Sequence, residues 1–395
     1  MNQLQSSLSV REKDLPLISE SQASFSKSSS KVTENEKDVN STIPKIGEIR
    51  KVLPADVFES SLFLSMAYVV RTLFLIVTLG SLFALYDNAF NLTQQGNTGG
   101  NFPLFSLLIH TAVVCVYAFF QGVLFWSVFT LGHDAGHSSF SRYDTINWIV
   151  GLCLHTSILV PYQAWRLSHK HHHSATGNMD RDEIFFPQRE RKRISHYMVL
   201  SLGFAWFIYL LTGYGDSPRI HHLNPFDRLF SKNLLLSLLS TGSLAAFAYF
   251  GVYQFGVLNF GWLALSLYYF LPLLVFASWL VITTFLHHNE PDAPWYGDQE
   301  WSWVRGNLSS IDRDYFPFNS IINNIGTHQI HHLFPSIPHY NLVRATKAFR
   351  KAFPHLVRKS DKNPLHAFYT NVVIYLTAKP PTVDTSVYVY KDHLE

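Results

Sequence analysis

Charged residues are scarce in this chain of 395 residues. Asp, Glu, Lys and Arg together make up 15% of the residues, whereas a typical soluble protein holds about 25%. Hydrophobic residues make up 47% and aromatic residues 15%, so the composition argues against an ordinary soluble enzyme. The net charge of +3 excludes the strongly basic surface of a nucleic-acid-binding protein, and no nucleic acid is expected as a partner.

Cysteines are also scarce, and the first residues lack the pattern of a cleaved signal peptide. Cys115 and Cys153 are the only two cysteines, and both lie in apolar stretches. Free cysteine behaves as a small hydrophobic side chain, so we expect two buried thiols rather than a disulfide or a metal site. Residues 1–50 are rich in Ser, Lys and Glu and lack the basic start and apolar core of a cleaved signal peptide. They predict a disordered cytosolic tail.

Four apolar stretches are long enough to cross a bilayer, which takes roughly 20 helical residues. They lie near residues 63–86, 104–131, 233–254 and 262–286. Two further stretches, near 146–163 and 196–213, contain Pro161 or Gly213 and are expected in or near the membrane interface. We predict an all-α integral membrane protein with four transmembrane helices, interfacial helices and a histidine-rich cytosolic cap. Residues 51–375 form the membrane domain, and residues 376–395 form a C-terminal cytosolic tail.

The distribution of positive charge predicts the orientation. The connections between the first two spans and between the last two contain no Lys or Arg, whereas seven such residues lie between Arg166 and Arg193. Positive residues prefer the cytosolic side, so both termini and the middle segment are expected there. The ends of the second and fourth spans then face the same side.

Histidines gather at these ends and segments. "HDAGH" and two H-x-x-H-H motifs, "HKHHH" and "HQIHH", contain eight of them at helical spacing: His133, His137, His169, His172, His173, His328, His331 and His332. Residues three or four apart share a helix face, and neutral imidazole is a good ligand for iron, copper and zinc. Eight converging nitrogens exceed what one tetrahedral zinc needs and fit two octahedral-type metals with open positions. The isolated histidines are expected to be ordinary satisfied polar side chains: His110, His155, His196 and His366.

The three motifs resemble the histidine boxes of integral-membrane fatty acid desaturases. "WRLSHKHHHSATGNMDRDE" is similar to that family's second-box region, and "EWSWVRGNLSSIDRDY" with "GTHQIHHLFPSIPHYNL" to its C-terminal signature. The resemblance covers residues from about 50 to 375. Front-end desaturases have Gln in place of His328, a fused cytochrome b5 would carry "HPGG", and the delta-9 acyl-CoA branch has a longer first box. The methyl-end branch remains, which acts at the omega-6 (delta-12) or omega-3 position, and "IGTHQIHHLFPSIPHY" is closer to the omega-3 members.

The resemblance implies the chemistry. Members use two iron ions (Fe2+/Fe3+) and O2 as co-substrate to insert a cis double bond into a fatty acyl lipid or acyl-CoA. They have a ninth histidine ligand after the fourth span, where "FLHHNE" offers His287 and His288, and alignment favours His288. Without a fused haem domain, electrons are expected from cytochrome b5 with its NADH reductase in the endoplasmic reticulum membrane. The basic segments Arg189–Arg193 and Lys347–Lys359 could receive an acidic donor, although membrane sidedness explains them equally well.

Carboxylates commonly orient the histidines that bind a metal. Five acidic residues near the motifs are candidates for this role: Asp134, Asp182, Glu183, Asp312 and Asp314. Each could instead be solvated or paired with a neighbour such as Arg181 or Arg313. Thr284, one helical turn before His288, is a candidate to hold a metal-bound water.

Two other functions remain open at this point. A hydroxylase or acetylenase built on the same diiron scaffold would share the histidine motifs, because hydroxylation and desaturation begin with the same hydrogen abstraction. A histidine-rich zinc or copper transporter is the alternative from another class, but transporters place their ligands near the middle of the bilayer. Here the histidines lie at or beyond the ends of the spans.

Overall fold

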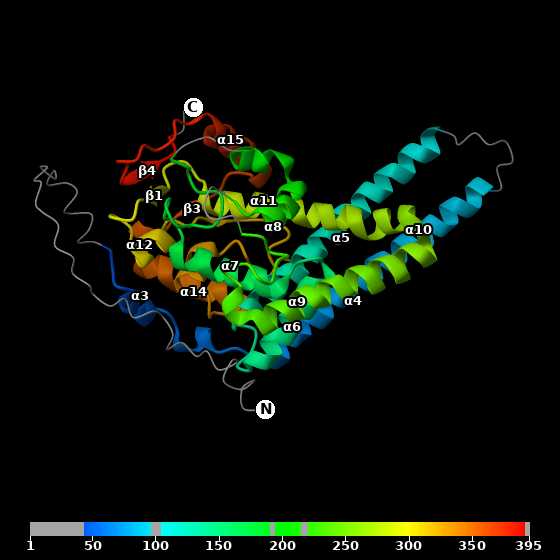
Figure 1. The fold of residues 1–395 in the computed structure, drawn as a ribbon, viewed down its shortest axis with the longest axis horizontal. Coiled ribbons are helices and arrows are strands. Elements are labelled where there is room, and N and C mark those ends of the chain that lie inside the picture. Colours follow the sequence, from blue (N-terminus) through cyan, green and yellow to red (C-terminus); the bar gives the residue numbers. More distant parts are fainter. Residues whose placement is uncertain (1–42, 96–103, 190–193, 215–219, 392–395) are drawn as a thin grey trace, which may run out of the picture.

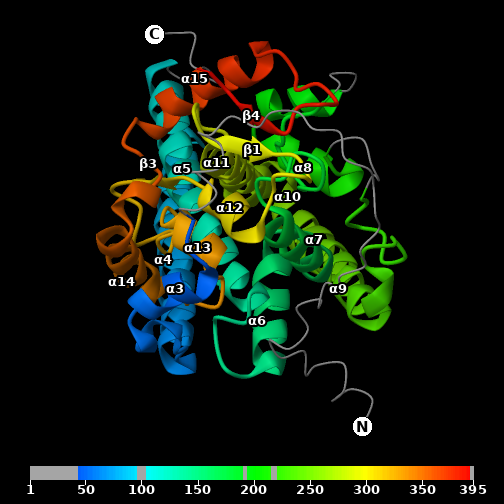
Figure 2. The ribbon, with the colours of Figure 1, turned by 90° about the vertical axis from the view of Figure 1, so that its left-hand side faces the viewer.

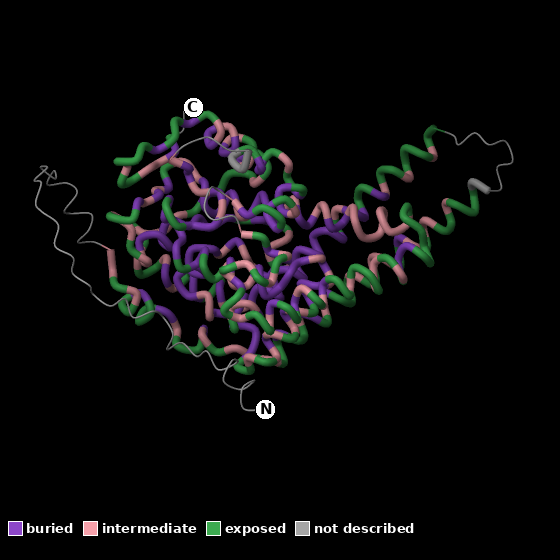
Figure 3. Tube along the Cα trace, in the orientation of Figure 1, coloured by how far each residue is buried: buried purple, intermediate pink, exposed green. Residues whose placement is uncertain are grey.

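The computed structural model describes residues 43–95, 104–189, 194–214 and 220–391, and this part of the chain is mostly helical. Long helices project to one side of a compact part in Figure 1. Side chains on the projecting helices are largely exposed, whereas buried residues fill the compact part (Figure 3). The predicted all-α architecture with a histidine-rich region is therefore observed at this level of detail.

The first two predicted spans are the two longest single helices, α4 (Leu62–Gln95) and α5 (Leu104–Gly136). With 34 and 33 residues and a rise of 1.5 Å per residue, each is about 50 Å long. Large apolar side chains such as Phe63, Phe74 and Leu85 are exposed along α4. A helix with apolar side chains on its outer surface is suited to lipid rather than water.

The last two predicted spans lie in one helical run of 58 residues, Ser231–His288. The run consists of η4 (Ser231–Asn233), α9 (Leu234–Ala246), the π-helix η5 (Phe247–Val257), α10 (Leu258–Leu265), the π-helix η6 (Ser266–Phe270) and α11 (Leu271–His288). Gly261 interrupts it with φ 79° and ψ 164°, a conformation that glycine adopts readily. Figure 1 shows the run reversing direction near α10.

The two shorter apolar stretches form bent or irregular helices. α6 (Asp144–Ser157) and α7 (Tyr162–Ala175) meet at an angle of 107°, and Pro161 precedes the first residue of α7, where proline is compatible with a helix start. The 3-10 helix η3 (Ile194–Ser201) leads into α8 (Gly203–Thr212). By length and composition, three described helical runs could cross a membrane, or four if α6 and α7 count as one broken span.

The prediction of two buried thiols is half right. Cys115 on α5 and Cys153 on α6 are both free, but both are exposed on the protein surface. An apolar sequence around a residue does not imply burial when the helix surface faces lipid. Apolar neighbours therefore overstated the burial of these two side chains.

The compact part is built from short elements of the N-terminal and C-terminal regions. They are α3 (Ile46–Val52), η2 (Ala55–Phe58), β1 (Pro294–Tyr296), α12 (Trp303–Leu308), β2 (Asp312–Arg313), α13 (His328–Leu333), α14 (His339–Ala352), η7 (Pro354–Leu356), β3 (Lys359–Ser360), α15 (Pro364–Thr377) and β4 (Val387–Val389). Figure 2, which looks onto this part, shows α12, α13 and α14 grouped with α3, and contacts link α12 to α7 as well. The arrangement brings the third histidine motif on α13 against the second on α7.

Two small sheets close the compact part. β1 pairs antiparallel with β4, and β2 pairs parallel with β3. The backbone of Tyr296 in β1 also donates to Gly177 O and accepts from Met179 N, at 2.8 and 2.9 Å. The C-terminal strand, β1 and the loop after α7 are therefore joined, and part of the segment expected as a tail lies in a sheet.

α5 and α11 form the central helix pair of the molecule. A Cβ atom on Gly122 of α5 would lie 2.6 Å from Val275 Cβ and 2.8 Å from Pro272 O of α11, so only glycine allows this approach. The buried core around the pair includes Trp126, Phe129, Phe276 and Phe285. Close packing fixes the C-terminal ends of α5 and α11 relative to each other, and each of these ends carries histidines of the site.

Candidate metal centre

Nine histidines from four separate parts of the chain converge at the base of the long helices. α5 supplies His133, the turn after it supplies His137, α7 supplies three, the end of α11 supplies one and α13 supplies three. The set is His133, His137, His169, His172, His173, His288, His328, His331 and His332. It includes every histidine predicted as a ligand, and it divides into two groups.

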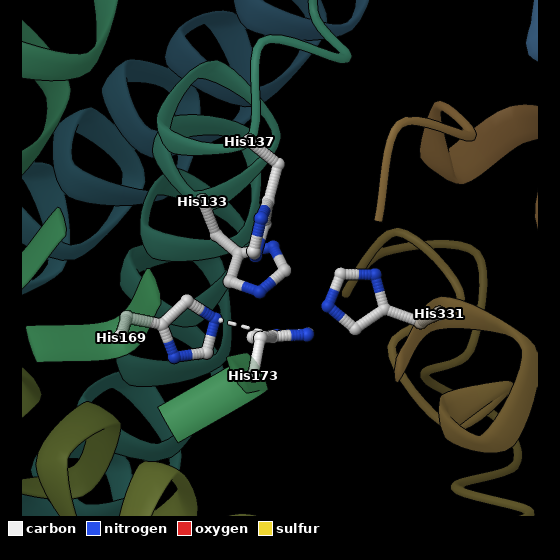
Figure 4. A group of neighbouring side chains, drawn as sticks. All are labelled: His133, His137, His169, His173 and His331. Atoms are coloured by element: carbon white, nitrogen blue, oxygen red, sulfur yellow. Dashed lines mark hydrogen bonds between the residues drawn. The ribbon is translucent and has the colours of Figure 1, made fainter. Parts of the chain in front are cut away.

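The first group contains five histidines, shown in Figure 4. One ligand atom from each lies within 4.8 Å of those of the others: His133, His137, His169, His173 and His331. The rings point toward a common centre, and the Nε2 atoms of His169 and His173 are 3.1 Å apart. The group therefore presents several imidazole nitrogens to one small volume.

The second group contains four histidines. His172, His288 and His332 offer ligand atoms within 4.8 Å of one another. The Nε2 atom of His328 lies 3.3 Å from that of His288 and 2.8 Å from that of His332. These short approaches place His328 in the same group.

Each H-x-x-H-H motif serves both groups. His169 and His173, four residues apart on α7, face the first group, while His172 faces the second. On α13 the pattern is reversed, because His331 faces the first group while His328 and His332 face the second. Neighbouring helix positions differ by about 100°, so adjacent histidines cannot point to one metal but can bind two.

The nitrogen spacing is compatible with a bound metal. Ligands at right angles about 2.1 Å from a metal lie about 3 Å apart, and the Nε2 separations of His172–His288, His288–His328 and His328–His332 are 3.2, 3.3 and 2.8 Å. In the first group, Nε2 of His137 and of His331 is buried without a hydrogen-bond partner among the residues that the structure describes. Buried polar atoms normally have a partner, and a cation would supply it.

The charge state also suits metal binding. Burial, reinforced by neighbouring histidines, lowers the pKa of His328, His331 and His332 well below its usual value. The rings are therefore neutral at pH 7, the form in which imidazole binds a metal. Each group could hold a metal ion.

Hydrogen bonds orient two histidines of the second group. His172 Nδ1–H donates to Asp182 Oδ1 at 2.6 Å, and the same carboxylate accepts the backbone N–H groups of Gly177 and Glu183 at 3.0 and 2.7 Å. His332 Nδ1–H faces Asn307 Oδ1 at 3.1 Å. Both bonds leave Nε2 with its lone pair directed into the group.

The other predicted acidic residues contact the site less directly. Asp312 Oδ1 accepts the backbone N–H of Gln329 at 2.8 Å, at the start of α13, and its Oδ2 pairs with Arg350 at 2.7 Å. Asp134 accepts from both the backbone N–H and Nδ1 of His339, at 3.0 and 2.8 Å. Asp134 Oδ1 also lies 3.9 Å from Nδ1 of His133, a histidine of the first group.

The remaining candidates differ in their surroundings. Glu183 contacts His171 Nδ1 at 2.5 Å, and His171 belongs to neither group. Asp314 is exposed, and within the described part of the chain it accepts from Phe316 N and Asn319 Nδ2. Of the alternative ion pairs, Arg313 contacts Glu290 and Arg181 contacts Asp298, so neither pairs with a candidate carboxylate.

Sequence reasoning missed Asn307, Thr176 and His339. Asn307 and Thr176 both lie at 3.1 Å from His332 Nδ1, yet a single Asn or Thr carries no spacing signal.

The expectation for His155 was wrong in part. His155 is buried and belongs to neither histidine group. Neither of its ring nitrogens has a hydrogen-bond partner in the described structure, and its ring packs on Trp165 with centroids 4.4 Å apart.

A largely apolar cavity reaches both groups. Its empty volume is about 950 Å³, which includes open solvent. Its walls come from α5, α7, α8 and α11, and the lining includes Trp126, Phe129, Phe185, Trp206, Leu280 and Thr284. His133, His172 and His288 lie at its surface, so a ligand in the cavity would lie against both groups.

Known proteins are similar to this sequence over most of its length. The family model described as fatty acid desaturase matches residues 106–359. The chain is 40% identical to an sn-1 acyl-lipid omega-3 desaturase (ferredoxin) of Synechocystis, over 82% of this chain and 85% of that protein. It is 38% identical to an acyl-lipid omega-3 desaturase (cytochrome b5) of the endoplasmic reticulum from Arabidopsis thaliana, over 82% and 81%. A chloroplastic omega-3 fatty acid desaturase from Ricinus communis is 36% identical, over 81% and 67%.

Proposed function

The chain belongs to the fatty acid desaturase family, and from this premise we propose that it is a membrane-bound omega-3 acyl-lipid desaturase with a diiron centre. It inserts a cis double bond toward the methyl end of an unsaturated acyl chain. One O2, two electrons and two protons are consumed, two hydrogens leave adjacent carbons, and two waters form. The observation that carries the proposal is the convergence of nine histidines beside an apolar cavity.

The five-histidine group and the four-histidine group would each hold one iron. Imidazole suits iron, and open coordination positions remain for O2. When bound, the paired irons supply the oxidant that removes hydrogen from an unactivated C–H bond, which no side chain can do by acid–base chemistry. The protein's own contribution is to hold nine ligands, exclude water and position the acyl chain.

Three residues would orient the ligands. Asp182 holds His172 by a direct bond and Asn307 holds His332, and loss of such a bond typically weakens metal binding 10- to 100-fold. Asp312 acts one step further away, because it anchors the first turn of the helix that carries three ligands. Asp134 fixes His339 next to the first box, and Glu183 and Thr284 line the cavity.

The apolar cavity would bind the acyl chain. Methylene groups gain roughly 0.8 kcal/mol each when they leave water, so a long chain binds without polar contacts along its length. The lining side chains Trp126, Phe129 and Leu280 would place the reacting carbons beside both groups. The names of the relatives favour an acyl group on a lipid rather than on CoA.

The helices would cross the membrane four times, with both termini and the histidines on the cytosolic side. His133 follows Leu104 by 29 residues along α5, which is about 44 Å of helix. A hydrocarbon layer of about 30 Å that begins near Leu104 therefore ends well before the histidine. Such a position favours an enzyme over a transporter, whose ligands lie near the middle of the bilayer.

The electron donor would be cytochrome b5 with its NADH reductase, and the location the endoplasmic reticulum. One relative of that membrane is named for cytochrome b5, whereas the Synechocystis relative is named for ferredoxin. Of the two basic segments, α14 is the better docking site, since Lys347 and Lys351 are exposed. Arg189 instead binds Asp180 and C-terminal carbonyl groups, and Arg191–Arg193 lie outside the described residues.

Expression in a host without polyunsaturated fatty acids tests the proposal. Cells receive oleate or linoleate, and fatty acids are analysed by gas chromatography with mass spectrometry. We expect a triene with a new omega-3 double bond from linoleate, and none from cells that carry His331→Ala. A hydroxylated product, or a diene from oleate with no triene from linoleate, would overturn the omega-3 assignment. Purified protein should hold two irons per chain.

A further inference from the structure

His287, the neighbour of the proposed ligand His288, is buried at the end of α11 and lines the cavity. Its Nδ1–H donates to Ile311 O at 2.6 Å, because a carbonyl can only accept. Its Nε2 therefore carries the lone pair and accepts from the hydroxyl of Tyr315 at 3.2 Å. Both ring nitrogens are engaged, so His287 has no free nitrogen for a metal.

The ring of His287 lies flat against that of His328. Their centroids are 4.0 Å apart and their planes differ by 22°. Tyr315 meets His287 from the side, with centroids 5.7 Å apart at 71°. Two hydrogen bonds thus fix the plane of His287, and one of its faces supports His328.

His328 needs this support because its other nitrogen lacks a partner. In the four-histidine group, His172 and His332 are held at Nδ1 by Asp182 and Asn307. The Nδ1 atom of His328 is buried with no hydrogen-bond partner among the residues that the structure describes. An imidazole with no bond at its second nitrogen can rotate about its side-chain torsions, unless packing restrains the ring.

We propose that His287 is a positioning residue that holds the His328 ring by stacking, so that His328 Nε2 stays directed into the four-histidine group. The inference rests on the proposed diiron function and names the residue that keeps one of the two irons in place. Tyr315 and the Ile311 carbonyl extend this support to the segment between α12 and α13. The pair "HH" in "FLHHNE" then has two roles, since His288 would bind a metal and His287 would hold another ligand.

Two substitutions separate stacking from hydrogen bonding. His287→Asn keeps an N–H donor near Ile311 O but has no ring to stack. His287→Phe combined with Tyr315→Phe keeps a flat ring and removes the hydroxyl that would lose its acceptor. His366→Asn, at an exposed position on α15, is the matched control.

Full-length protein is purified in detergent, loaded with 57Fe and measured for iron per chain, rate of iron release to a chelator, Mössbauer spectrum and melting temperature. We expect His287→Asn to melt near the wild-type temperature but to lose one iron 10- to 100-fold faster, with a changed signal from one iron only. The Phe/Phe variant and His366→Asn should keep both irons.

Three results would overturn the inference. His287→Asn could hold two irons with the wild-type release rate and spectrum, or it could lose both irons equally. The Phe/Phe variant could lose iron as fast as His287→Asn, which would mean that stacking gives no support. If His287→Asn fails to fold, the Phe/Phe variant decides, since retention of both irons supports stacking and loss refutes it. Wild-type protein without iron would instead overturn the proposed function.

Discussion

Replacement of Asp182 by Asn tests the electrostatic side of the site with almost no change in shape. The Asp182 side chain is fully buried, and its carboxylate accepts three N–H groups, from His172, Gly177 and Glu183. An Asn oxygen can keep the two bonds that Asp182 Oδ1 makes, to His172 and Glu183. Its amide NH2 then faces the Gly177 N–H, so two donors meet without an acceptor.

The size of the effect follows from these bonds. A hydrogen bond to a charged group contributes about 1.5–3 kcal/mol, and 1.4 kcal/mol corresponds to a factor of ten. The His172 bond loses its charge and the Gly177 bond is lost, so iron in the four-histidine group should bind roughly 10- to 100-fold more weakly. Turnover should fall with iron content rather than independently of it.

Iron per chain, its release to a chelator and triene formation from linoleate measure this effect. Asp314→Asn is the matched control, because Asp314 is exposed and its hydrogen bonds in the described structure are to residues of its own loop. It should match the wild type in all three measurements. Asp182→Asn protein with two irons, wild-type release and full turnover would refute the orienting role of this carboxylate.

Three further predictions address other parts of the molecule. Asn307→Ala removes one of the two oxygen atoms that lie 3.1 Å from His332 Nδ1, while Thr176 Oγ1 remains. It should weaken iron binding about tenfold, as measured by chelator competition, and unchanged affinity would contradict the role. Gly132→Ala places a Cβ 2.2 Å from Nδ1 of the buried His155 ring on α6. This clash should lower the free energy of unfolding by about 1–3 kcal/mol. Gly80→Ala has open space and serves as its control, so equal melting temperatures would refute the clash. Burial lowers the pKa of His222 to about 3, whereas its value in the unfolded chain is near 6.5. Between these two pH values only the unfolded chain binds the proton. The free energy of unfolding therefore falls as the pH falls, by up to about 1.4 kcal/mol per pH unit. His222→Phe should weaken this loss between pH 7 and pH 5 in thermal unfolding, and an identical pH dependence would contradict it.

The histidine convergence could be predicted because it depends on spacing and on the parity of spans. Apolar runs end at His133 and His288, and charged connections place the remaining motifs on the same side. The division of each H-x-x-H-H motif between two groups was not predicted. Residues three apart share a helix face, yet His169 and His172 belong to different groups.

The orienting contacts could not be predicted in the same way. Asp182 follows the second motif closely, so proximity in sequence identified it. Asn307 reaches His332 across 25 residues, through packing of α12 on α13, and no periodic pattern marks such a contact. Among the acidic candidates, sequence distance could not separate Asp182 from Asp314, because the direction of each side chain depends on the fold of its loop.

The path of the backbone could not be predicted from the sequence at two places. The 107° bend between α6 and α7 follows Ser157, where Leu159 adopts a positive φ of 56°, an uncommon state for leucine. β4 contains only three residues, too few for an alternating pattern to stand out from a disordered tail. Both features depend on tertiary contacts rather than on local preference.

The pairing of β4 with β1 has a consequence for how the protein matures. The long helices can enter a bilayer while the ribosome is still at work, since each needs only its own apolar residues. The loop that contains Asp182 is different, because it is hydrogen-bonded to the backbone of Tyr296 in β1. β1 in turn pairs with residues 387–389 of β4. We therefore expect the proposed iron site to form only after residues 387–389 have been synthesised.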